Sequence, residues 1–448
     1  MTRHRTEAAA LETALERARS SPLYAERLRG VSIREPEDLE RVPLTTRADL
    51  QRAGVHGTRA VPLDRVCHYG ETSGTTGASN STWLTAEDLR GNARAIAARH
   101  PELFGPGRVL LNRFPFMAAP AHLIQLIAQE GGGISVPAGN INWDVPFPRA
   151  LDLAITTGAQ VLVSLPVEPI VLERLARERG LDPANATRFD AFFLGGAPLP
   201  PAMRARMAHV FGVRVVELYG STETMLLGTG CPEGTLHLET DLVHVEVLEC
   251  DRDAPVVPGR EGRLVVTTLA IEGSPLVRFE TGDLVRELAP CKCGDPRLGI
   301  VVLGRTADEL RVAGAKLHPY DVIDVGAEAA ASLDSSVFFV VVLRDRILVR
   351  IESETGGDPA ARAESRLGVP VEIERVAANE LLDVELLTRS PRVYKPVVLS
   401  DWQRPGRRIV SLNEGMIEWP KIGAAEAWRW LRRNLSRTSR RRRLLRSG

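Results

Sequence analysis

The chain of 448 residues exceeds the length at which a single hydrophobic core keeps growing, so we expect one large domain with at least one smaller companion. Hydrophobic residues make up 44% and charged residues 25% of the sequence, which is ordinary for a soluble globular protein. The formal net charge is zero, yet nine arginines and no acidic residue follow position 428, so residues 1–428 carry a charge of −9. An acidic body argues against nucleic acid as the main ligand.

The apolar segments and the cysteines argue against a membrane or secreted protein. The longest apolar run, VFFVVVL at 337–343, is far too short to cross a bilayer and is typical of a buried strand. The N-terminal sequence MTRHRTEAAALETALERA lacks the apolar core of a signal peptide, so we expect a cytoplasmic protein without a transmembrane segment. Five cysteines without an export signal favour metal binding or burial over disulfides.

Strand and helix signals alternate along the chain up to about residue 305. Short β-branched runs at 161–165, 191–194 and 213–220 are separated by segments with helical spacing, such as VLERLARERG at 171–180. Around 262–279 the pattern changes to strands broken by glycine and proline.

Beyond Gly304 a helix at 320–332 precedes strands at 337–343 and 346–351, and from about 401 the alternation ends. The sequence therefore predicts an α/β protein with three parts. These are a layered domain over 1–305 with a small β-rich subdomain, a small α+β domain over 306–400, and a basic tail over 401–448.

The stretch ETSGTTG at 71–77 has the composition of a phosphate-binding loop. Glycines at 74 and 77 let backbone N–H groups turn inward, and hydroxyls at 72, 73, 75 and 76 add further donors. A Ser/Thr/Gly-rich surface turn is the alternative interpretation of this stretch. A Walker loop is excluded, because no Gly-Lys-Ser/Thr follows.

Four further motifs occur in order: GGAP at 195–198, LYGSTET at 218–224, FETGDLV at 279–285 and GRTADELRVAGAKLHP at 304–319. With ALERARSSPLYAERLRG and LERVPLTTRADL near the N-terminus, they make the chain resemble the adenylate-forming superfamily of acyl-CoA ligases, adenylation domains and luciferases. The resemblance is to its phenylacetate-CoA ligase-like branch and covers about residues 10–400.

The resemblance implies a site for ATP and Mg²⁺. The phosphate loop would comprise Thr72, Ser73, Gly74, Thr75, Thr76 and Gly77. The adenine would lie along Gly195, Gly196 and Ala197, with Tyr219 stacked on it and Gly220 beside it. Glu223 matches the acid that coordinates Mg²⁺, Thr222 the hydroxyl that faces the α-phosphate, Asp283 the ribose-binding carboxylate and Arg305 a supporting arginine. Carboxylates suit both a ribose diol and a hard cation.

The reaction implied by the resemblance has two halves. A substrate carboxylate displaces pyrophosphate to form an acyl-AMP, and a thiol, CoA in the simplest case, then displaces AMP. The family uses a lysine of its small mobile domain as the catalytic cation, and Lys395 occupies the matching place, although the preceding residue is Tyr394 rather than glycine. The hinge of the small domain would be Asp308.

Related loops continue Gly-Lys-Pro, whereas here Gly77 is followed by Ala78, Ser79 and Asn80. We interpret the missing lysine as weaker ATP affinity or slower loop closure with activity kept, because amides and hydroxyls can hold phosphates. A non-catalytic nucleotide-binding homologue is the competing interpretation.

The acid and its acceptor are left open. Phe114, Phe116, His122 and Met225 are candidates to line the acyl pocket, and the branch favours an aromatic acid. A carrier protein or an amine could replace CoA, and a small oxyanion such as nitrite could replace the acid. In the tail, AAEAWRWLRRNLSR at 424–437 can form a helix that either docks on the body or binds an acidic partner or a membrane surface.

Two pairs of residues suggest a structural zinc site. Cys231 and His237 lie in CPEGTLH, and Cys291 and Cys293 lie in CKCG, so together they form a Cys₃His set. Proteins of the phenylacetate-CoA ligase-like branch often carry the same residue types at these points. Cys67 and Cys250 have no partner, and we expect them to be buried small hydrophobic residues.

Overall fold

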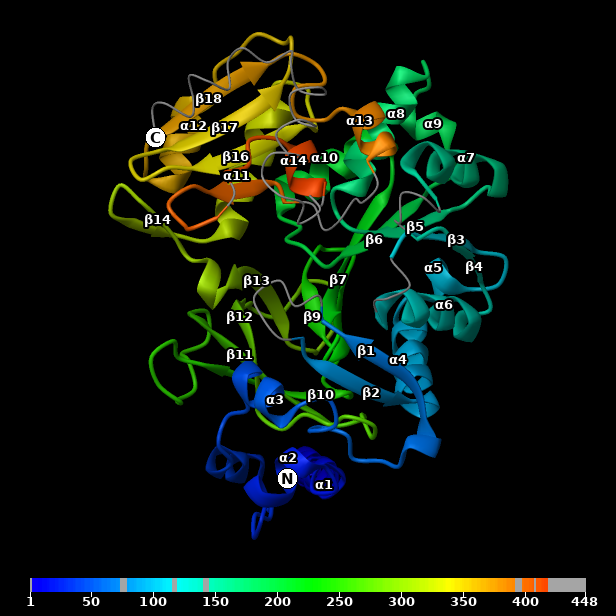
Figure 1. Ribbon diagram of the computed structural model, residues 1–448, viewed down its shortest axis with the longest axis vertical. Coiled ribbons are helices and arrows are strands. Elements are labelled where there is room, and N and C mark those ends of the chain that lie inside the picture. Colours follow the sequence, from blue (N-terminus) through cyan, green and yellow to red (C-terminus); the bar gives the residue numbers. More distant parts are fainter. Residues whose placement is uncertain are drawn as a thin grey trace, which may run out of the picture.

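The computed structural model describes residues 2–72, 79–114, 119–139, 145–390, 397–406 and 408–417. Its two parts are a large N-terminal domain and a smaller domain stacked on one end of it (Figure 1). Of the predicted site residues, those at 73–77, Phe116 and Lys395 lie outside the described residues, as does the tail helix.

Within the described residues, one sheet of eleven strands runs through the large domain in the order β10-β11-β12-β13-β9-β8-β7-β6-β5-β3-β4. Its parallel half consists of β3 (Val109–Asn112), β4 (Ile134–Pro137), β5 (Val161–Ser164), β6 (Ala191–Gly195) and β7 (Arg214–Ser221). Its antiparallel half adds β8 (Met225–Gly230), β9 (Leu236–Leu238), β10 (Val243–Leu248), β11 (Glu261–Thr268), β12 (Phe279–Glu287) and β13 (Gly299–Arg305).

Helices bury both faces of the parallel half. On β5 and β6, Val161, Val163 and Phe193 face one apolar cluster, whereas Leu162 and Phe192 face another. The first cluster includes residues of α4 (Ala86–Arg99), α5 (Pro101–Phe104) and α6 (Ala119–Gly131). The second includes residues of α7 (Phe147–Thr157), α8 (Glu168–Glu178) and α10 (Pro201–Phe211), with the short α9 (Pro183–Ala186) beside them. This is why these strands read as continuous apolar runs.

The N-terminal segment closes the other end of the large domain and places one helix beside β12. It contains α1 (Thr2–Ala18), α2 (Pro22–Arg27), η1 (Pro36–Arg41) and α3 (Arg47–Ala53), followed by η2 (Leu63–Arg65) and a hairpin of β1 (Val66–Glu71) and β2 (Ser81–Thr85). Thr45 bridges to β12: its N–H donates to the carbonyl of Arg278 at 2.8 Å and its carbonyl accepts from Glu280 at 2.9 Å. The buried Tyr24 hydroxyl donates to Thr45 Oγ1 at 3.1 Å. The start of α3 is thereby fixed next to β12.

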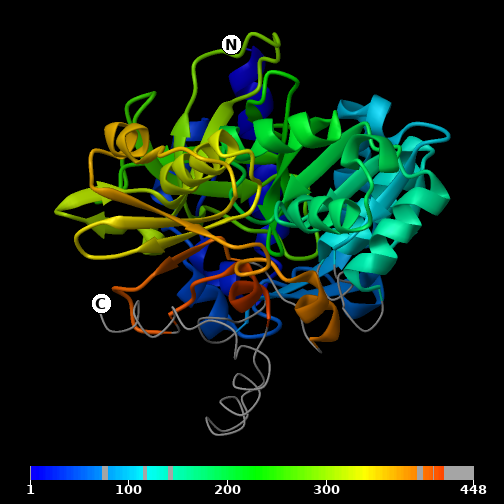
Figure 2. The same ribbon diagram turned by 90° about the horizontal axis from the view of Figure 1, so that it is seen from above.

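The small domain begins after η3 (Thr306–Asp308). Its sheet has the order β18-β17-β16-β19 and lies beside the large sheet rather than within it (Figure 2). Its elements are the hairpin of β14 (Leu310–Val312) and β15 (Ala315–Leu317), α11 (Pro319–Ser332), β16 (Phe338–Val342), β17 (Ile347–Glu352), α12 (Ala360–Leu367), β18 (Val371–Val376), α13 (Val384–Arg389), β19 (Leu399–Asp401) and α14 (Leu412–Met416).

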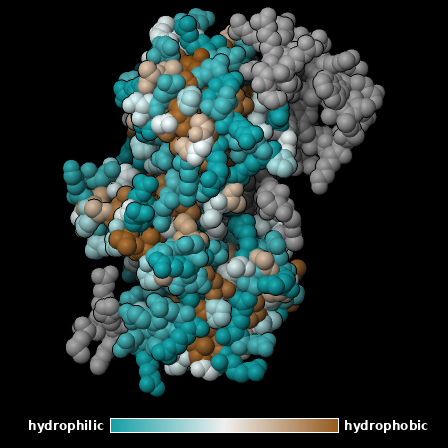
Figure 3. Space-filling model, turned by 90° about the vertical axis from the view of Figure 1, so that its left-hand side faces the viewer, coloured by the Kyte–Doolittle hydropathy of each residue, from teal (hydrophilic) through white to brown (hydrophobic). Residues whose placement is uncertain are grey.

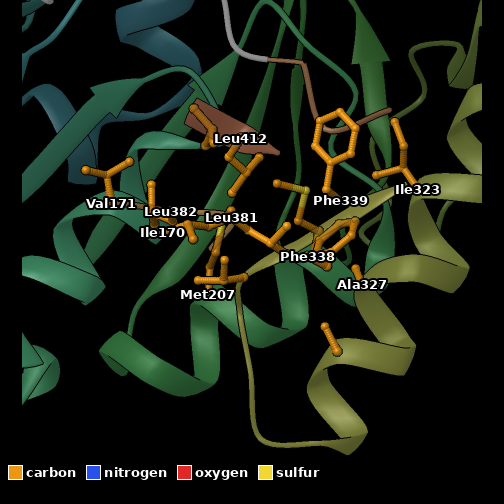
Figure 4. Close-up of a cluster of buried hydrophobic side chains, with 14 of the residues drawn as sticks. Ile170, Val171, Met207, Ile323, Ala327, Phe338, Phe339, Leu381, Leu382 and Leu412 are labelled. Carbon is orange, nitrogen blue, oxygen red and sulfur yellow. The ribbon is translucent and has the colours of Figure 1, made fainter. Parts of the chain in front are cut away.

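A continuous apolar cluster joins the two domains. Figure 4 shows Met207 of α10 and Ile170 of α8 beside Phe338, Leu381 and Leu382 of the small domain. Between them the remaining cavity is only about 10 Å³. Polar contacts frame this interface: the N–H of Ala202 donates to Asp324 Oδ1 at 2.7 Å, and Arg206 Nη1 donates to Asp334 Oδ1 at 2.9 Å.

The surface carries no dominant apolar patch on the face drawn in Figure 3, where hydrophobic residues lie in small groups among hydrophilic ones. Among the described residues, no helix has the length and apolar character needed to span a membrane.

Candidate active site

The site lies where the sheet changes from parallel to antiparallel pairing. β6 ends at Gly195, which pairs with Leu218 of β7, and β7 then turns through residues 222–224 into the antiparallel β8. A Cβ on Gly195 would lie 2.2 Å from the Leu218 carbonyl oxygen, and one on Gly220 would lie 2.1 Å from that of Met225. Only glycine permits such close strands here. Strand ends at a point where the topology changes are the usual position of ligands in α/β sheets.

Glu223 is a buried carboxylate whose two oxygens have different surroundings. Asn80 Nδ2 donates to Glu223 Oε1 at 2.9 Å, and Arg47 Nη2 lies 3.8 Å from the same oxygen. Within the described ranges, no hydrogen bond reaches Oε2. One carboxylate oxygen is thus fixed by side chains while the other can take a cation. Thr222, the expected α-phosphate hydroxyl, precedes it in the same turn and is half-buried.

Asp283 lies opposite Arg305 on β12 and β13 and close to Tyr219 of β7. The Tyr219 hydroxyl donates to Asp283 Oδ2 at 2.5 Å, and Arg305 Nε lies 3.7 Å from Oδ1. Burial raises the pKa of Asp283, while the hydrogen bond from Tyr219 and the charges of Arg305 and Arg47 oppose that rise. Burial and the neighbouring carboxylate raise the pKa of Tyr219 well above its usual range. The structure therefore brings the expected ribose and adenine residues into direct contact.

Thr72 stands at the mouth of the β1–β2 hairpin. Its Oγ1 accepts the N–H of Asn80 at 2.9 Å, and its own N–H donates to the carbonyl of Asn80 at 3.0 Å. Because Asn80 also reaches Glu223, the base of the expected phosphate loop is tied directly to the expected metal ligand.

The expected acyl pocket is small and apolar. A cavity of about 40 Å³ is lined by Phe114, Leu123, Gly196, Gly220 and Met225, among others. Met225 adopts the left-handed conformation with φ of 58°, which turns the chain from the 222–224 turn into β8. His122 is not among the lining residues; its ring packs edge-on against His68, with centroids 5.0 Å apart.

A second cavity, of about 320 Å³, lies between the domains beside the expected adenine strand. Ala197 and Pro198 contribute from the large domain, and Asp308, Leu310 and Arg404 contribute from the expected hinge and the small domain. Arg404 contacts both sides of Asp308: it donates to the carbonyls of Ala307 at 2.6 Å and Glu309 at 2.8 Å, and its Nε donates to Asp401 at 2.9 Å.

The four residues of the Cys₃His set meet in one place. Their ligand atoms all lie within 4.8 Å of one another, with Cys231 Sγ 3.7 Å from Cys291 Sγ and Cys293 Sγ 3.3 Å from His237 Nε2. Atoms bound at about 2.3 Å to one tetrahedral ion lie about 3.8 Å apart, so the cluster fits zinc. His237 Nδ1 is 3.1 Å from the carbonyl of Arg297, which leaves Nε2 directed at the thiols.

The expectation that Cys67 and Cys250 are buried is wrong, because both are exposed. Cys67 lies in β1, whose residues alternate between partly buried and exposed sides, and Cys250 lies after β10 in an exposed turn. A free cysteine is often buried, but an edge hairpin and a turn offer no core to bury it.

Comparison with known proteins decides the family. A profile of the family described as "AMP-binding enzyme" matches residues 8–271. The chain belongs to this family. This AMP-binding enzyme is 31% identical over 299 residues to the phenylacetate-coenzyme A ligase of Thermus thermophilus and 27% identical over 301 residues to that of Escherichia coli K12. These matches span 64% of this chain, and 65% and 66% of the two relatives.

Solved structures show the same fold for the AMP-binding enzyme. A 2-hydroxyisobutyryl-CoA ligase in the postadenylation state, in complex with R3-HIB-AMP, matches 98% of this chain and 93% of its own with a TM-score of 0.75 at 20% identity. The same ligase in the thioesterification state, in complex with 2-HIB-AMP and CoA, matches 89% and 90% with a TM-score of 0.62 at 22% identity.

Sequence reasoning missed Arg47 and Asn80 as residues of the site. Arg47 lies within LERVPLTTRADL, and the spacing Thr46 to Asp49 signals the capping box that starts α3. That signal places the arginine at a helix start, but it carries no information about Glu223, which lies far along the chain.

Proposed function

We propose that this AMP-binding enzyme is an ATP-dependent acid–CoA ligase. It activates a carboxylic acid as an acyl-AMP with release of pyrophosphate and then transfers the acyl group to the thiol of CoA. One observation carries the proposal: Asp283, held by Tyr219 and Arg305, lies at the same point of the sheet as Glu223, whose Oε2 accepts no hydrogen bond from the described residues. The phenylacetate-coenzyme A ligases to which the chain is similar support the same activity.

Each residue has a chemical task in this proposal. Asp283 accepts hydrogen bonds from both ribose hydroxyls, and Thr222 donates to the α-phosphate. Glu223 Oε2 is suited to hold Mg²⁺, which when bound neutralises charge on the phosphates. Lys395 is the proposed cation for the adenylation transition state, in which charge builds on the α-phosphoryl group, with Asp308 as the hinge that carries it in and out. The loop at 72–77 holds the outer phosphates.

We propose an aromatic acid as the substrate, on the strength of the phenylacetate-coenzyme A ligase relatives. The apolar walls of Phe114, Leu123 and Met225 suit an uncharged acyl group. At about 40 Å³ the cavity is smaller than the roughly 150 Å³ that admits benzene in an engineered core. An aromatic ring therefore requires its walls to move, so short-chain acids belong in the same test.

We further propose that Cys231, His237, Cys291 and Cys293 hold a structural zinc ion. The thiol–thiol and thiol–imidazole distances support this set, and four protein ligands leave no open position for a substrate. The site ties Cys231, after β8, and His237, in β9, to the segment between β12 and β13, and it stabilises the antiparallel half that carries Asp283.

The test is pyrophosphate release with Mg-ATP across aromatic acids, short-chain acids and nitrite, each with and without CoA. Release that depends on one acid and accelerates with CoA is the expected result. Release that CoA does not change would redirect the acceptor to a carrier protein or an amine. No release with any candidate, together with tight ATP binding, would favour a nucleotide-binding homologue without turnover. Asp283→Ala serves as the inactive control.

A further inference from the structure

The phosphate loop lacks the lysine found in related loops, and the chain offers few lysines to replace it. Its lysines are Lys292, Lys316, Lys395 and Lys421, whereas lysine and arginine together number 57. Amides and hydroxyls of the loop can hold phosphates, and any side-chain cation that assists them is far more often an arginine than a lysine in this chain.

Arg47 stands at the start of α3, and the local structure fixes its backbone. The Thr46 side chain accepts the N–H of Asp49 at 3.2 Å, and Asp49 Oδ2 accepts the N–H of Thr46 at 2.8 Å. The adjacent bridge of Thr45 to β12 holds this helix start against the strand that carries Asp283.

The side chain of Arg47 has few polar contacts with the described residues. It is 34% exposed, and within the described residues its contact is one long ion pair, 3.8 Å from Glu223 Oε1, with no hydrogen bond. A guanidinium carries five N–H donors. Asn80 already donates to the same Glu223 oxygen at 2.9 Å, so this carboxylate stays partnered when Arg47 turns to another anion.

Its position lies between the two ends of the proposed nucleotide site. Arg47 is close enough to Asp283 to lower the pKa of that carboxyl, and it faces Glu223 directly. A nucleotide with its ribose at Asp283 and its metal-bound phosphates at Glu223 must place phosphate oxygens beside this guanidinium. Arginine is suited to them, because its planar fork matches phosphate oxygens in pairs.

We propose that Arg47 is a phosphate-binding residue that contacts the outer phosphates of Mg-ATP and the pyrophosphate leaving group, in place of the missing loop lysine. This inference rests on the proposed function. The alternative role of Arg47 is to neutralise Glu223 and Asp283 without touching the ligand. Loss of a neutralising charge beside Asp283 changes ATP and AMP binding alike, and loss of one beside Glu223 strengthens rather than weakens Mg²⁺ binding. A loss of affinity for ATP and pyrophosphate but not for AMP therefore separates phosphate contact from neutralisation.

The experiment measures the equilibrium affinity of the full-length protein for ATP, AMP and pyrophosphate with Mg²⁺, using Arg47→Ala, Arg47→Lys and Arg52→Ala. Arg52 lies on the same helix, is 76% exposed and pairs with Asp49, so its loss removes the same charge away from the site. Losing a charge-assisted bond should weaken ATP and pyrophosphate binding of Arg47→Ala about 10- to 100-fold, with AMP changed less than about threefold. Arg47→Lys should stay within about tenfold of the unaltered protein, because a lysine keeps the charge but not the fork.

The melting temperature of each variant checks that the fold is retained. Equal losses for ATP and AMP in Arg47→Ala, or a loss matched by Arg52→Ala, would overturn the inference and leave Arg47 a neutralising residue. Unchanged ATP affinity in Arg47→Ala would overturn it as well. If the unaltered protein itself bound no ATP, the proposed function and this inference would fall together.

Discussion

Replacing Tyr219 by phenylalanine tests how the site keeps Asp283 ionised. The change removes only the hydroxyl that donates to Asp283 Oδ2 at 2.5 Å and keeps the ring proposed to stack on adenine. Asp283 must carry its charge to accept two ribose hydroxyls. Burial raises its pKa, and the Tyr219 hydrogen bond is the largest effect opposing that rise.

The magnitude follows from the strength of this bond. A hydrogen bond to a charged group contributes about 1.5–3 kcal/mol, and about 1.4 kcal/mol corresponds to a tenfold change in an equilibrium constant. Removing it should raise the pKa of Asp283 further. Since protonated Asp283 binds ribose poorly, AMP affinity should be lost on acidification at a higher pH than in the unaltered protein, and at an acidic pH it should be about 10- to 100-fold weaker.

The assay is AMP affinity as a function of pH for the unaltered protein, Tyr219→Phe and Asp283→Asn. Asp283→Asn should bind AMP weakly, and its affinity should not fall further on acidification, because it has no carboxyl at this position to titrate. If Tyr219→Phe and the unaltered protein lost affinity at the same acidic pH, the reasoning would be refuted. A loss of affinity on acidification that persists in Asp283→Asn would refute it as well.

Three further predictions concern stability, the hinge and the metal. Burial lowers the pKa of His100, whose Nε2 lies 2.9 Å from Thr229 Oγ1, to about 4. Between about pH 7.5 and about pH 5, His100 becomes protonated in the unfolded chain but stays neutral in the folded protein. Acidification over this range should therefore lower the free energy of unfolding by about 2 kcal/mol, and His100→Gln should not show this loss. Urea melts in which both proteins have the same dependence on pH would contradict the prediction. Arg404→Ala should speed trypsin cleavage at Arg305 or Arg311 about tenfold, because two hydrogen bonds across the proposed hinge are lost. The control is Arg346→Ala, which removes an arginine of the same domain that donates to Glu372, and it should change the rate less than about twofold. Equal cleavage rates in the two variants would contradict the hinge role of Arg404. Metal analysis should find about one zinc ion per chain. The content should fall below about half an equivalent in Cys293→Ser and stay unchanged in the control Cys250→Ser. Zinc content that Cys293→Ser does not lower would refute the ligand set.

The sequence predicts helices and strands well where the apolar pattern is compatible with only one type of element. The run at 161–165 becomes β5, 191–194 becomes β6, and the helical spacing at 171–180 overlaps α8, which ends two residues earlier. These segments are buried against helices on both faces, so local pattern and tertiary environment agree. The sequence around 262–279 predicts a small β-rich subdomain. In the structure its strands β11 and β12 are hydrogen-bonded into the antiparallel half of the large sheet.

Contacts between distant residues are what the sequence could not supply. The approach of Arg47 to Glu223 depends on how Thr45 docks on β12, and no local signal encodes that docking. The hydroxyl of Tyr219 was assigned no partner, because its partner lies on another strand. The exposure of Cys67 follows from its place in an edge hairpin rather than from its residue type.

The apolar contact between the domains makes any swing of the small domain temperature-dependent. Met207 and Ile170 are nearly fully buried against Phe338 and its neighbours, so rotating the small domain away exposes hydrocarbon to water. Hydration of apolar surface carries a positive heat capacity, and the free energy that holds such surfaces together weakens on cooling. The balance between docked and rotated poses should therefore shift toward the rotated pose in the cold, and the thermal dependence of a turnover limited by that motion should be curved rather than linear in an Arrhenius plot.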